Sequence, residues 1–313
     1  MKINLIGKSF DTNSGQGIYR YSGELFEGLT ANELNVSKNL RGDINHVQQP
    51  ELIWQAIFKK KVITTIHDVM PIFNSERNPL FRLFFYFSVF LSTIKSKKII
   101  AVSECTKRDI FKYFPWAKKK TRVIYEAVNS SVFYPTKRKK NKKFIIGYLG
   151  GLGKRKNVEF ILELAKNLPN IEFKIGGAGR EKERLEEIAK IHKLNNVLFL
   201  GFITKEKMNA FYNSLDLFFF PSYYEGFGLP VLEAMACRIP VLVSDRGSLP
   251  EIVPNKNSVI DIKNIESTLR RIKSIHKDKK IYNLMCKKNI LKAREFSQDK
   301  FIKETIDSYN NIR

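Results

Sequence analysis

The amino-acid sequence predicts an α/β protein made of two doubly wound domains. The chain has 313 residues, and at ~100–200 residues per domain this length suits two domains with cores of their own. Hydrophobic residues make up 43% of the chain and charged residues 27%, the balance of a globular protein rather than a disordered or fibrous one. Short apolar runs alternate with helical patterns almost throughout, which is typical of parallel α/β sheets.

Short runs of apolar and β-branched residues predict the strands, in two groups. The first sheet is expected to contain Ile3–Ile6, Val62–Ile66, Ile99–Val102 and Arg122–Tyr125. The second is expected to contain Phe144–Leu149, Glu172–Ile175, Val197–Leu200, Leu217–Phe220 and Pro240–Val243. Helical spacing or strong helix formers predict helices at Glu159–Asn167, Lys182–Lys193, Lys205–Ser214 and Leu232–Cys237.

Three further segments complete the organisation of the chain. Ala31–Glu51 is polar and weakly patterned, and we expect a loop or a loosely ordered insertion there. Thr136–Lys143 is a charge run without apolar residues, which predicts a solvated linker between the domains. Apolar residues recur at helical spacing through Phe296–Ile312, which predicts one amphipathic helix. Because doubly wound sheets bind ligands at the carboxyl ends of their strands, we expect a site in a cleft between the domains.

The charge of the chain is strongly basic. Lysine and arginine outnumber aspartate and glutamate by 55 to 31, which gives a formal net charge of +24 at pH 7. The excess is concentrated in residues 1–143, which carry 26 basic and 11 acidic side chains. Such a field attracts polyanions, whether nucleic acid, anionic lipid headgroups or a diphosphate substrate. Charge alone does not choose among them.

Cysteine usage and hydropathy suggest a cytoplasmic protein. Cys105, Cys237 and Cys286 lie far apart, with no Cys-x-x-Cys pair and no histidine at ligand spacing, so we expect a reducing compartment and no metal site. The N-terminus lacks the apolar stretch and cleavage site of a signal peptide. The longest apolar run, Leu80–Ile94, is interrupted by Arg82 and is shorter than the ~20 residues that cross a bilayer.

The most informative segment is Phe220–Glu233, which leads from a predicted buried strand through a glycine-rich turn into a helix. Gly226 and Gly228 let the backbone approach a ligand closely, and free N–H groups near a helix N-terminus suit a phosphate or a sugar hydroxyl. Glu225 and Glu233 lie before and after this turn, so both can face the same ligand. Carboxylates accept hydrogen bonds from vicinal hydroxyls, which makes ribose and hexose natural partners.

This segment resembles the Glu-x7-Glu motif of retaining glycosyltransferase family 4, and the resemblance extends over most of the chain. Residues 147–157 read Gly-Tyr-Leu-Gly-Gly-Leu-Gly-Lys-Arg-Lys-Asn, which is similar to the first strand of the family's C-terminal domain and its Arg-Lys-Asn loop. Residues 240–251 resemble the strand and Pro-Glu turn that follow the motif.

The resemblance also implies the fold and its division. The family has the GT-B fold, in which two doubly wound Rossmann-like domains face a central cleft, and its C-terminal helix crosses back to the first domain. It therefore implies an N-terminal acceptor-side domain of residues 1–140 plus 296–313. A C-terminal nucleotide-sugar-binding domain of residues 141–295 follows from the same comparison.

Site residues carry over from the family position by position. Arg155 and Lys156 are expected to neutralise the donor diphosphate. Glu225 is expected to contact the hydroxyls of the transferred sugar, while Glu233 holds the ribose hydroxyls. Further contacts to the sugar or phosphate are expected from Gly226, Phe227, Gly228 and Leu229. Fixed cations and oriented N–H groups stabilise the charge on a leaving nucleotide diphosphate without a metal, so we expect neither a metal nor another cofactor.

In the N-terminal half, His67 and Asp68 come directly after a predicted strand, at the edge where ligands bind. A histidine in such a place is more often structural than catalytic when it is considered alone. By resemblance, His67 contacts the donor sugar, and Asp68 lies near the reacting centre or shapes the loop. Residues 14–21 resemble the family's glycine loop, in which Gly17 would lie against the donor phosphates or the acceptor.

The resemblance implies that the chain moves a hexosyl unit from a nucleotide-diphospho-sugar to a glycan or lipid-linked acceptor with retention of configuration. Glu225 would orient the sugar rather than attack it, and the leaving phosphate would help to take the acceptor proton. The Arg-Lys-Asn subgroup includes many mannosyltransferases, so mannose from GDP-mannose is the expected substrate, and UDP-sugars stay open.

Two rival functions remain. A nucleic-acid-modifying glycosyltransferase would use the positive charge, although no aromatic-rich basic groove or recognition helix is visible. A sugar-nucleotide epimerase shares the fold, but the paired glutamates with Arg-Lys-Asn form a transferase pattern.

The segment Leu80–Lys98 leaves two interpretations open. It contains five phenylalanines, Tyr86 and the lysine cluster 95–98. One interpretation is an interfacial helix that docks on anionic lipid, which would place the protein at the inner face of a membrane, within reach of a lipid-linked acceptor. The other is a core helix with a charged end.

Overall fold

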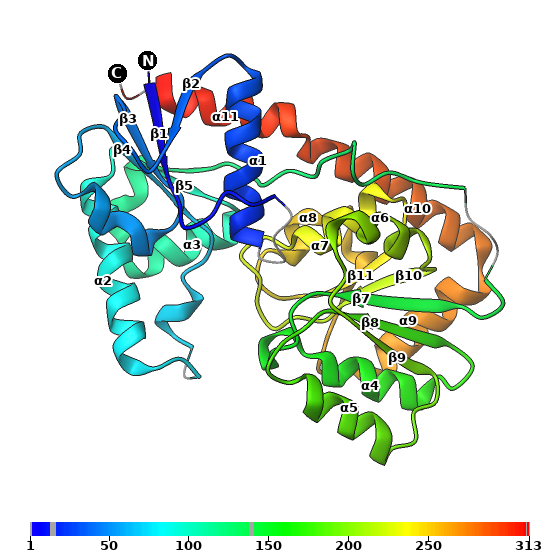
Figure 1. Ribbon diagram of the computed structural model, residues 1–313. Coiled ribbons are helices and arrows are strands. Elements are labelled where there is room, and N and C mark those ends of the chain that lie inside the picture. The colour runs from blue at the N-terminus through cyan, green and yellow to red at the C-terminus, as the bar shows by residue number, and fades with distance from the viewer. Residues whose placement is uncertain (1, 13–16, 75, 138–140, 311, 313) are drawn as a thin grey trace. The chain divides into compact units, whose positions relative to one another are not determined.

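The computed structural model describes residues 2–12, 17–74, 76–137, 141–310 and 312 (Figure 1). Contacts between Cα atoms divide the chain into two compact units. Unit 1 contains residues 1–127 together with 298–313, and unit 2 contains residues 128–297. The sequence prediction placed these divisions at residues 140 and 295. Each unit is built on its own parallel sheet.

Unit 1 has six parallel strands in the order β2-β1-β3-β4-β5-β6. The strands are β1 (Lys2–Ile6), β2 (Asn35–Lys38), β3 (Ile44–Val47), β4 (Val62–Ile66), β5 (Lys98–Ala101) and β6 (Thr121–Val123). The α-helices are α1 (Gly17–Ala31), α2 (Pro79–Lys95), α3 (Glu104–Tyr113) and α11 (Gln298–Asn310). Short 3-10 helices form at η1 (Pro50–Ala56), η2 (Met70–Ile72) and η3 (Pro115–Lys120).

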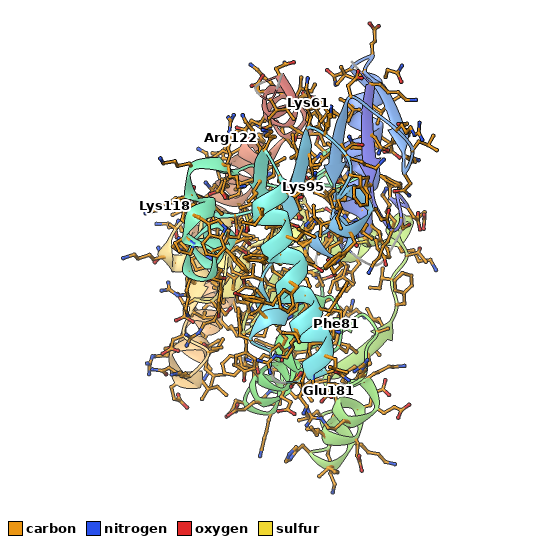
Figure 2. The ribbon with its side chains drawn as sticks, turned by 90° about the vertical axis from the view of Figure 1, so that its left-hand side faces the viewer. Lys61, Phe81, Lys95, Lys118, Arg122 and Glu181 are labelled. Atoms are coloured by element: carbon orange, nitrogen blue, oxygen red, sulfur yellow. The ribbon has the colours of Figure 1, made fainter. Side chains whose placement is uncertain are left out.

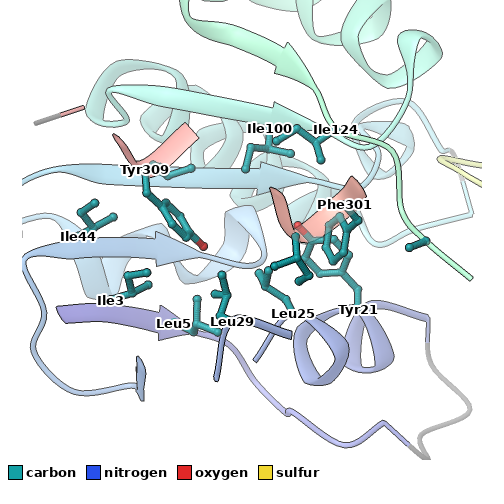
Figure 3. Packing of buried hydrophobic residues seen from close by; sticks show 13 residues of the cluster. Ile3, Leu5, Tyr21, Leu25, Leu29, Ile44, Ile100, Ile124, Phe301 and Tyr309 are labelled. Carbon is teal, nitrogen blue, oxygen red and sulfur yellow. The ribbon is translucent and has the colours of Figure 1, made fainter. Parts of the chain in front are cut away.

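Helices cover both faces of this sheet, as expected for a doubly wound fold. On one face, α1 and α11 pack on strand residues such as Ile3 and Ile44, and their contacts include Leu25 and Phe301 (Figure 3). On the other face, α2 and α3 pack against β4 and β5 in a second cluster. A Cβ on Gly28 would lie 2.4 Å from Ile302 Cδ1, so a side chain at this position would force Ile302 to shift where α1 packs on α11.

The expectation of a loop over Ala31–Glu51 is wrong. This stretch contains the end of α1, strands β2 and β3, and the start of η1. Every residue of β3 is buried, including Asn45 and His46, whose polarity hid the strand from a search for apolar runs. Their side chains are hydrogen-bonded inside the unit: Asn45 Oδ1 accepts from Asn4 Nδ2 at 3.0 Å, and both ring nitrogens of His46 have partners.

Unit 2 has six parallel strands in the order β12-β11-β10-β7-β8-β9. The strands are β7 (Ile145–Leu149), β8 (Glu172–Gly176), β9 (Val197–Gly201), β10 (Leu217–Phe220), β11 (Val241–Ser244) and β12 (Val259–Ile260). The α-helices are α4 (Val158–Asn167), α5 (Lys182–Ile191), α6 (Lys205–Asn213), α7 (Leu229–Ala236), α8 (Leu249–Ile252), α9 (Ile265–Lys277) and α10 (Lys279–Ala293). Short 3-10 helices form at η4 (Lys154–Lys156), η5 (Lys256–Ser258) and η6 (Arg294–Phe296).

The strand prediction holds for all nine predicted runs, with ends shifted by at most two residues. Helix α7 begins at Leu229, three residues before the predicted start, because proline at the second helical position fits the first turn of a helix. Within the described part of the chain, no helix is both long enough and apolar enough to cross a membrane.

Candidate active site

The strand order of unit 2 fixes where a ligand site can form. The adjacent strands β7 and β10 stand at the point where the strand order reverses, so the chain winds away from them in opposite directions. The loops that follow these two strands, residues 150–156 and 221–228, therefore leave the carboxyl edge of the sheet side by side. Ligands of doubly wound sheets bind at this switch point.

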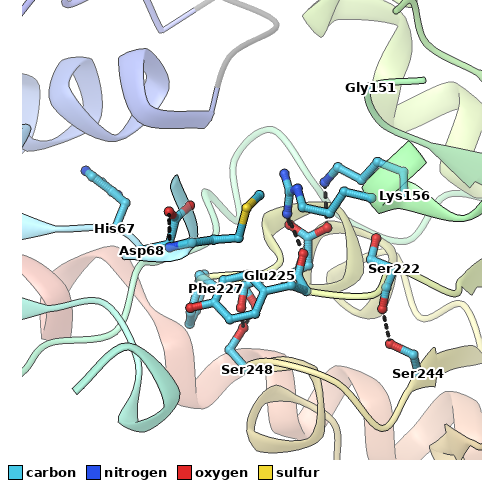
Figure 4. Close-up of polar contacts among 12 residues, drawn as sticks. His67, Asp68, Gly151, Lys156, Ser222, Glu225, Phe227, Ser244 and Ser248 are labelled. Atoms are coloured by element: carbon cyan, nitrogen blue, oxygen red, sulfur yellow. Dashed lines mark hydrogen bonds and ion pairs between the residues drawn. The ribbon is translucent and has the colours of Figure 1, made fainter. Parts of the chain in front are cut away.

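Three charged side chains from these loops converge on one another (Figure 4). Lys156 Nζ lies 2.6 Å from Glu225 Oε1, and Arg155 Nη1 lies 3.1 Å from Glu225 Oε2. The Lys156 ammonium also sits 5.1 Å from the centre of the Phe220 ring. One carboxylate thus binds two cations, which leaves a net positive charge at the switch point.

The ionisation of Glu225 follows from this environment. Burial raises the pKa of the Glu225 carboxyl, but the charges of Lys156 and Arg155 and the hydrogen bond from Lys156 outweigh that effect and hold its pKa below the ordinary value. Its side chain is only 9% exposed. Glu225 is therefore ionised at neutral pH and can accept hydrogen bonds from a hydroxyl-bearing ligand.

Backbone contacts lock the two loops together. The amide of Tyr223 donates to the Arg155 carbonyl at 2.9 Å, and the Arg155 guanidinium donates to the Tyr224 carbonyl. Asn157 adopts a left-handed conformation with φ of 54°, which asparagine tolerates better than most residues. Its side-chain amide donates to the Pro221 carbonyl at 3.2 Å. In the Arg-Lys-Asn run, the asparagine therefore positions the two cations.

The glycine-rich turn before α7 is hydrogen-bonded to the loop between β11 and α8. Ser248 Oγ donates to the carbonyls of Glu225 and Phe227 (Figure 4). A Cβ on Gly247, at φ of 59°, would lie 2.6 Å from the backbone of Glu225, so this close approach requires glycine. Gly228 has φ of 115° at the start of α7, which places the N–H groups of the first helical turn beside the Glu225 loop.

The second glutamate of the motif does not lie on an open surface. Glu233, on α7, is completely buried, and Tyr212 donates its hydroxyl to Glu233 Oε2 at 2.6 Å. Glu225 is also buried, at 7% exposure, and the expectation that both glutamates face one ligand stays a prediction.

A surface cavity of about 540 Å³ adjoins the Arg155–Asn157 loop. Its lining residues are Gly153, Lys154, Asn157, Val158, Glu159, Glu181, Arg184, Leu185 and Tyr223. Its lining does not include Arg155, Lys156 or Glu225, and it carries charges of both signs.

In unit 1, His67 lies against a buried glutamate at the carboxyl end of β4. Its Nδ1 lies 2.9 Å from Glu126 Oε1, its Nε2 lies 3.1 Å from the Gln48 carbonyl, and the Tyr21 ring packs edge-on at 4.7 Å. A carbonyl only accepts, so Nε2 carries a proton. The contact with Glu126 at Nδ1 fixes the orientation of the imidazole ring.

Behind this pair lies a polar network inside the unit 1 core. His46 contacts the Tyr309 hydroxyl with Nδ1 at 2.7 Å and the Thr65 hydroxyl with Nε2 at 2.8 Å, and Thr65 also bonds the Tyr21 hydroxyl at 3.1 Å. Burial, together with the charge of His67, lowers the pKa of His46 to about 3. His46 is thus a neutral residue that joins the C-terminal helix to the sheet.

The remaining predicted site residues lie in unit 1. Asp68 Oδ1 accepts from the Met70 amide at 3.2 Å, a contact that shapes the turn into η2 (Figure 4). Gly17 is exposed at the first position of α1. Residues 14–16 of the predicted glycine loop lie outside the described residues.

Sequence reasoning missed several residues that build the site. Glu126 is the partner of His67, and the one available signal was its position just after a predicted strand of the same sheet. Tyr212 and Ser248 hold Glu233 and the glycine turn from distant parts of the chain. No local pattern marks such long-range partners.

The fold and the site together define the class of protein. Sucrose-phosphate synthase from Thermosynechococcus elongatus matches over 99% of this chain and 98% of its own, with a TM-score of 0.84 at 18% identity. HepE of Anabaena, in complex with UDP and glucose, matches over 99% of both chains with a TM-score of 0.79 at 15% identity. The chain thus has the GT-B fold of glycosyltransferases.

Family models then identify the chain more closely. Residues 133–293 match the model described as Glycosyl transferases group 1, and residues 29–132 match Glycosyltransferase Family 4. The chain therefore belongs to the family 4 glycosyltransferases, and it is a glycosyltransferase.

Two of the proteins that are similar in sequence are named as mannosyltransferases. O-antigen chain mannosyltransferase B of Escherichia coli is 26% identical over 268 residues, which cover 80% of this chain and 70% of that protein. Serotype-specific mannosyltransferase WbdA of Escherichia coli is 28% identical over 262 residues, which cover 76% of this chain. The match spans only about a third of the length of WbdA.

Proposed function

We propose that this glycosyltransferase moves mannose from GDP-mannose to a glycan or lipid-linked acceptor and retains the anomeric configuration. The observation that carries the proposal is the convergence of Lys156 and Arg155 on Glu225 at the switch point of unit 2. Relatives named as mannosyltransferases support the choice of sugar.

In this proposal the two cations bind the donor diphosphate. Lys156 and Arg155 already hold one carboxylate, so their geometry suits an anion. When the anomeric C–O bond breaks, negative charge grows on the leaving diphosphate, and fixed cations stabilise it. The N–H groups of Phe227, Gly228 and Leu229, at the start of α7, add oriented donors for the phosphate or the sugar. Gly226 keeps the backbone open to the ligand.

Glu225 turns to the hydroxyls of the transferred sugar once the diphosphate has taken over its cations. Glu233 contacts the ribose, and Tyr212 orients its carboxylate through the 2.6 Å hydrogen bond. Because Glu225 orients the sugar rather than attacking it, the leaving phosphate takes the acceptor proton. We propose that no metal is needed, since the two cations supply the charge that a metal would otherwise provide.

The predicted site residues of unit 1 have roles of their own in this proposal. We propose that His67 contacts the donor sugar and that Glu126 keeps its ring oriented through the 2.9 Å contact at Nδ1. Asp68 shapes the loop that follows, and Gly17 marks the start of the helix that lies against donor phosphates or acceptor. The acceptor is met at the cytoplasmic face of a membrane.

The proposal is tested with purified protein, chelator and a panel of GDP-, UDP- and ADP-sugars offered with a mannosylated lipid acceptor. Transfer from GDP-mannose that survives chelation, with an axial anomeric linkage in the NMR spectrum of the product, supports it. Transfer from another donor alone, an inverted linkage, or loss of transfer on chelation contradicts the corresponding part.

A UDP-sugar donor is the second candidate. Its support is the HepE structure, which contains UDP and glucose within the same fold. The donor panel decides between the two, because a transferase that uses UDP-sugars transfers from UDP-glucose or a UDP-N-acetylhexosamine and leaves GDP-mannose intact.

A further inference from the structure

Helix α2 has an unusual distribution of side chains for a surface helix of a folded unit. All of its exposed residues are apolar, and they include Leu80 at 76% and Ile94 at 56% exposure. The buried residues are Phe85, Val89 and three hydroxyl residues, Ser88, Ser92 and Thr93, whose hydroxyls bond carbonyls of the same helix. The outward face is thus more apolar than the inward one, the reverse of the usual pattern.

The exposed residues form one continuous stripe. They recur at spacings of three, four and seven, so they fall within about a third of the helix circumference. The members of this stripe are Leu80, Leu83, Phe84, Phe87, Phe90 and Ile94. A contiguous apolar face of this kind marks a contact with a partner or with lipid.

Two tryptophans, the only ones in the chain, flank the stripe. Trp54 stacks on Phe84 with ring centres 6.4 Å apart, and Trp116 packs edge-on against Phe90 at 5.9 Å. Both indoles are about half exposed. Each donates its N–H to a hydroxyl of α2, Trp54 to Ser88 and Trp116 to Thr93. Indole rings that contact water on one side and apolar groups on the other are typical of membrane interfaces.

Basic residues gather at one end of this stripe. Segments 59–61, 95–98 and 118–122 immediately precede or enter the neighbouring parallel strands β4, β5 and β6, so all three lie at the amino edge of the unit 1 sheet. They contain ten basic residues and no acidic one, here called the basic rim: Lys59, Lys60, Lys61, Lys95, Lys97, Lys98, Lys118, Lys119, Lys120 and Arg122.

The basic rim and the stripe meet at the C-terminal end of α2. Lys61, Lys95, Lys118 and Arg122 lie toward this end of the helix, whereas Phe81 lies near the other (Figure 2). Lys120 Nζ donates to the carbonyls of Ile94 and Ser96 and so closes the last turn of α2.

Phe58 adds an apolar side chain within the basic rim. It is 99% exposed and directly precedes Lys59 in the loop that leads to β4. An isolated aromatic ring among lysines is costly in water, but it suits the boundary between headgroups and acyl chains.

We propose that the apolar stripe of α2, flanked by Trp54 and Trp116 and bordered by the basic rim, docks this protein on an anionic lipid membrane. The helix lies flat in the interface, its leucines and phenylalanines enter the acyl boundary, and the lysines contact anionic headgroups. The inference deepens the proposed function, in which the acceptor is met at a membrane, but its test reads lipid binding and not sugar transfer.

Charge complementarity favours lipid over the other occupants. Ten cations beside an apolar stripe match a surface that is anionic outside and apolar beneath. A second copy that docked through the same face would bring two basic rims together, which like-charge repulsion opposes. Nucleic acid would match the rim but would leave the apolar stripe exposed to water.

The test uses the full-length chain with vesicles of phosphatidylcholine, with and without about a third phosphatidylglycerol. Since Trp54 and Trp116 both flank the stripe, their fluorescence should shift to the blue on anionic vesicles and be quenched by brominated acyl chains. The protein should co-sediment with the anionic vesicles at least tenfold more than with the neutral ones, and added salt should weaken this binding.

Variants locate the contact. Leu83→Gln with Phe87→Gln should lower vesicle binding at least tenfold, because glutamine keeps the helix but removes the apolar contact. The matched control is Leu284→Gln with Leu291→Gln, two equally exposed leucines on α10 of unit 2, which should bind as the wild type does. Thermal unfolding of both variants checks that each is folded.

Several results would overturn the proposal. One is the absence of both co-sedimentation and a fluorescence change at low salt, and another is an equal loss of binding in the α10 control. A dimer in sedimentation equilibrium that the α2 variant dissociates would identify a second copy as the partner. A blue shift with duplex DNA, and none with vesicles, would identify nucleic acid as the partner. Binding of GDP by the same samples, followed by thermal shift, separates a failure of docking from a failure of the proposed function.

Discussion

The carboxylate of Glu225 forms ion pairs with Lys156 and Arg155, the two cations that the donor diphosphate is proposed to bind. Replacing it by glutamine, Glu225→Gln, should therefore strengthen the binding of a free nucleoside diphosphate while it abolishes sugar transfer. The two effects have opposite signs because the carboxylate competes with the phosphate for Lys156 and Arg155 but serves the sugar hydroxyls in the complete donor complex.

The magnitude follows from the geometry. Lys156 Nζ lies 2.6 Å from Glu225 Oε1, and a phosphate oxygen at ~2.8 Å on the far side of Nζ would lie roughly 5 Å from that carboxylate oxygen. Two unit charges at this distance repel by about 3 kcal/mol at an effective dielectric of ~20. The Arg155 side chain is 31% exposed, and with solvent screening we expect about 1 kcal/mol, or roughly fivefold tighter binding.

The assay is isothermal titration calorimetry with GDP and UDP, beside kcat measured with the sugar donor. Glu225→Gln should bind the preferred diphosphate roughly fivefold more tightly, and its kcat should fall by about 100-fold or more with the loss of a charged hydrogen-bond acceptor. The control is Glu172→Gln, which removes the same charge from an ion pair with Lys174. Glu172 is the first residue of β8, so it lies at the amino edge of the sheet, opposite to the edge that carries Glu225. Diphosphate binding that weakens in Glu225→Gln would refute the reasoning, since Glu225 would then hold the cations in place for the phosphate.

Three further predictions concern stability. The pKa of His46 is about 3 in the folded state against 6.5 in the unfolded state, so its contribution to the free energy of unfolding is present above pH 6.5 and is lost as the pH falls toward 3. At pH 5 the loss is about 2 kcal/mol. Urea unfolding of the wild type at pH 7 and pH 5 should show this drop, and His46→Gln should not show it. Tyr212→Phe removes a 2.6 Å hydrogen bond to the buried Glu233 carboxylate and should lower the free energy of unfolding by about 2 kcal/mol; an unchanged denaturant midpoint would contradict it. Gly28→Ala places a Cβ 2.4 Å from Ile302 Cδ1 and should lower the free energy of unfolding by about 1–3 kcal/mol. Adding Ile302→Val to this variant should restore part of that free energy, and additive losses in the double variant would contradict the contact.

The sequence by itself determined the class of fold. Runs such as Leu217–Phe220 consist only of large apolar residues, and a short run of this kind followed by proline is typical of a buried parallel strand. The rule that ligands bind where parallel strands end predicted a site at the carboxyl edge of the sheets. The roles of Arg155, Lys156 and Glu225 came from the resemblance to the family, and they stay predictions.

What the sequence could not supply were pairings between residues far apart in the chain. Strand β3 was missed because Asn45 and His46 are polar, and only their buried partners explain how they enter a core. The same holds for Glu126 beside His67, since a hydrogen bond over 59 residues leaves no periodic trace.

Tertiary structure also decided which way side chains face. The spacing of Glu225 and Glu233 did not show that Glu233 is completely buried and accepts a hydrogen bond from Tyr212. Likewise, the aromatic content of α2 was compatible with a core helix or an interfacial one. The choice depends on which arc of the helix meets the sheet, and that is set by the packing of α2 on η1, β4 and β5, not by the composition of the helix itself.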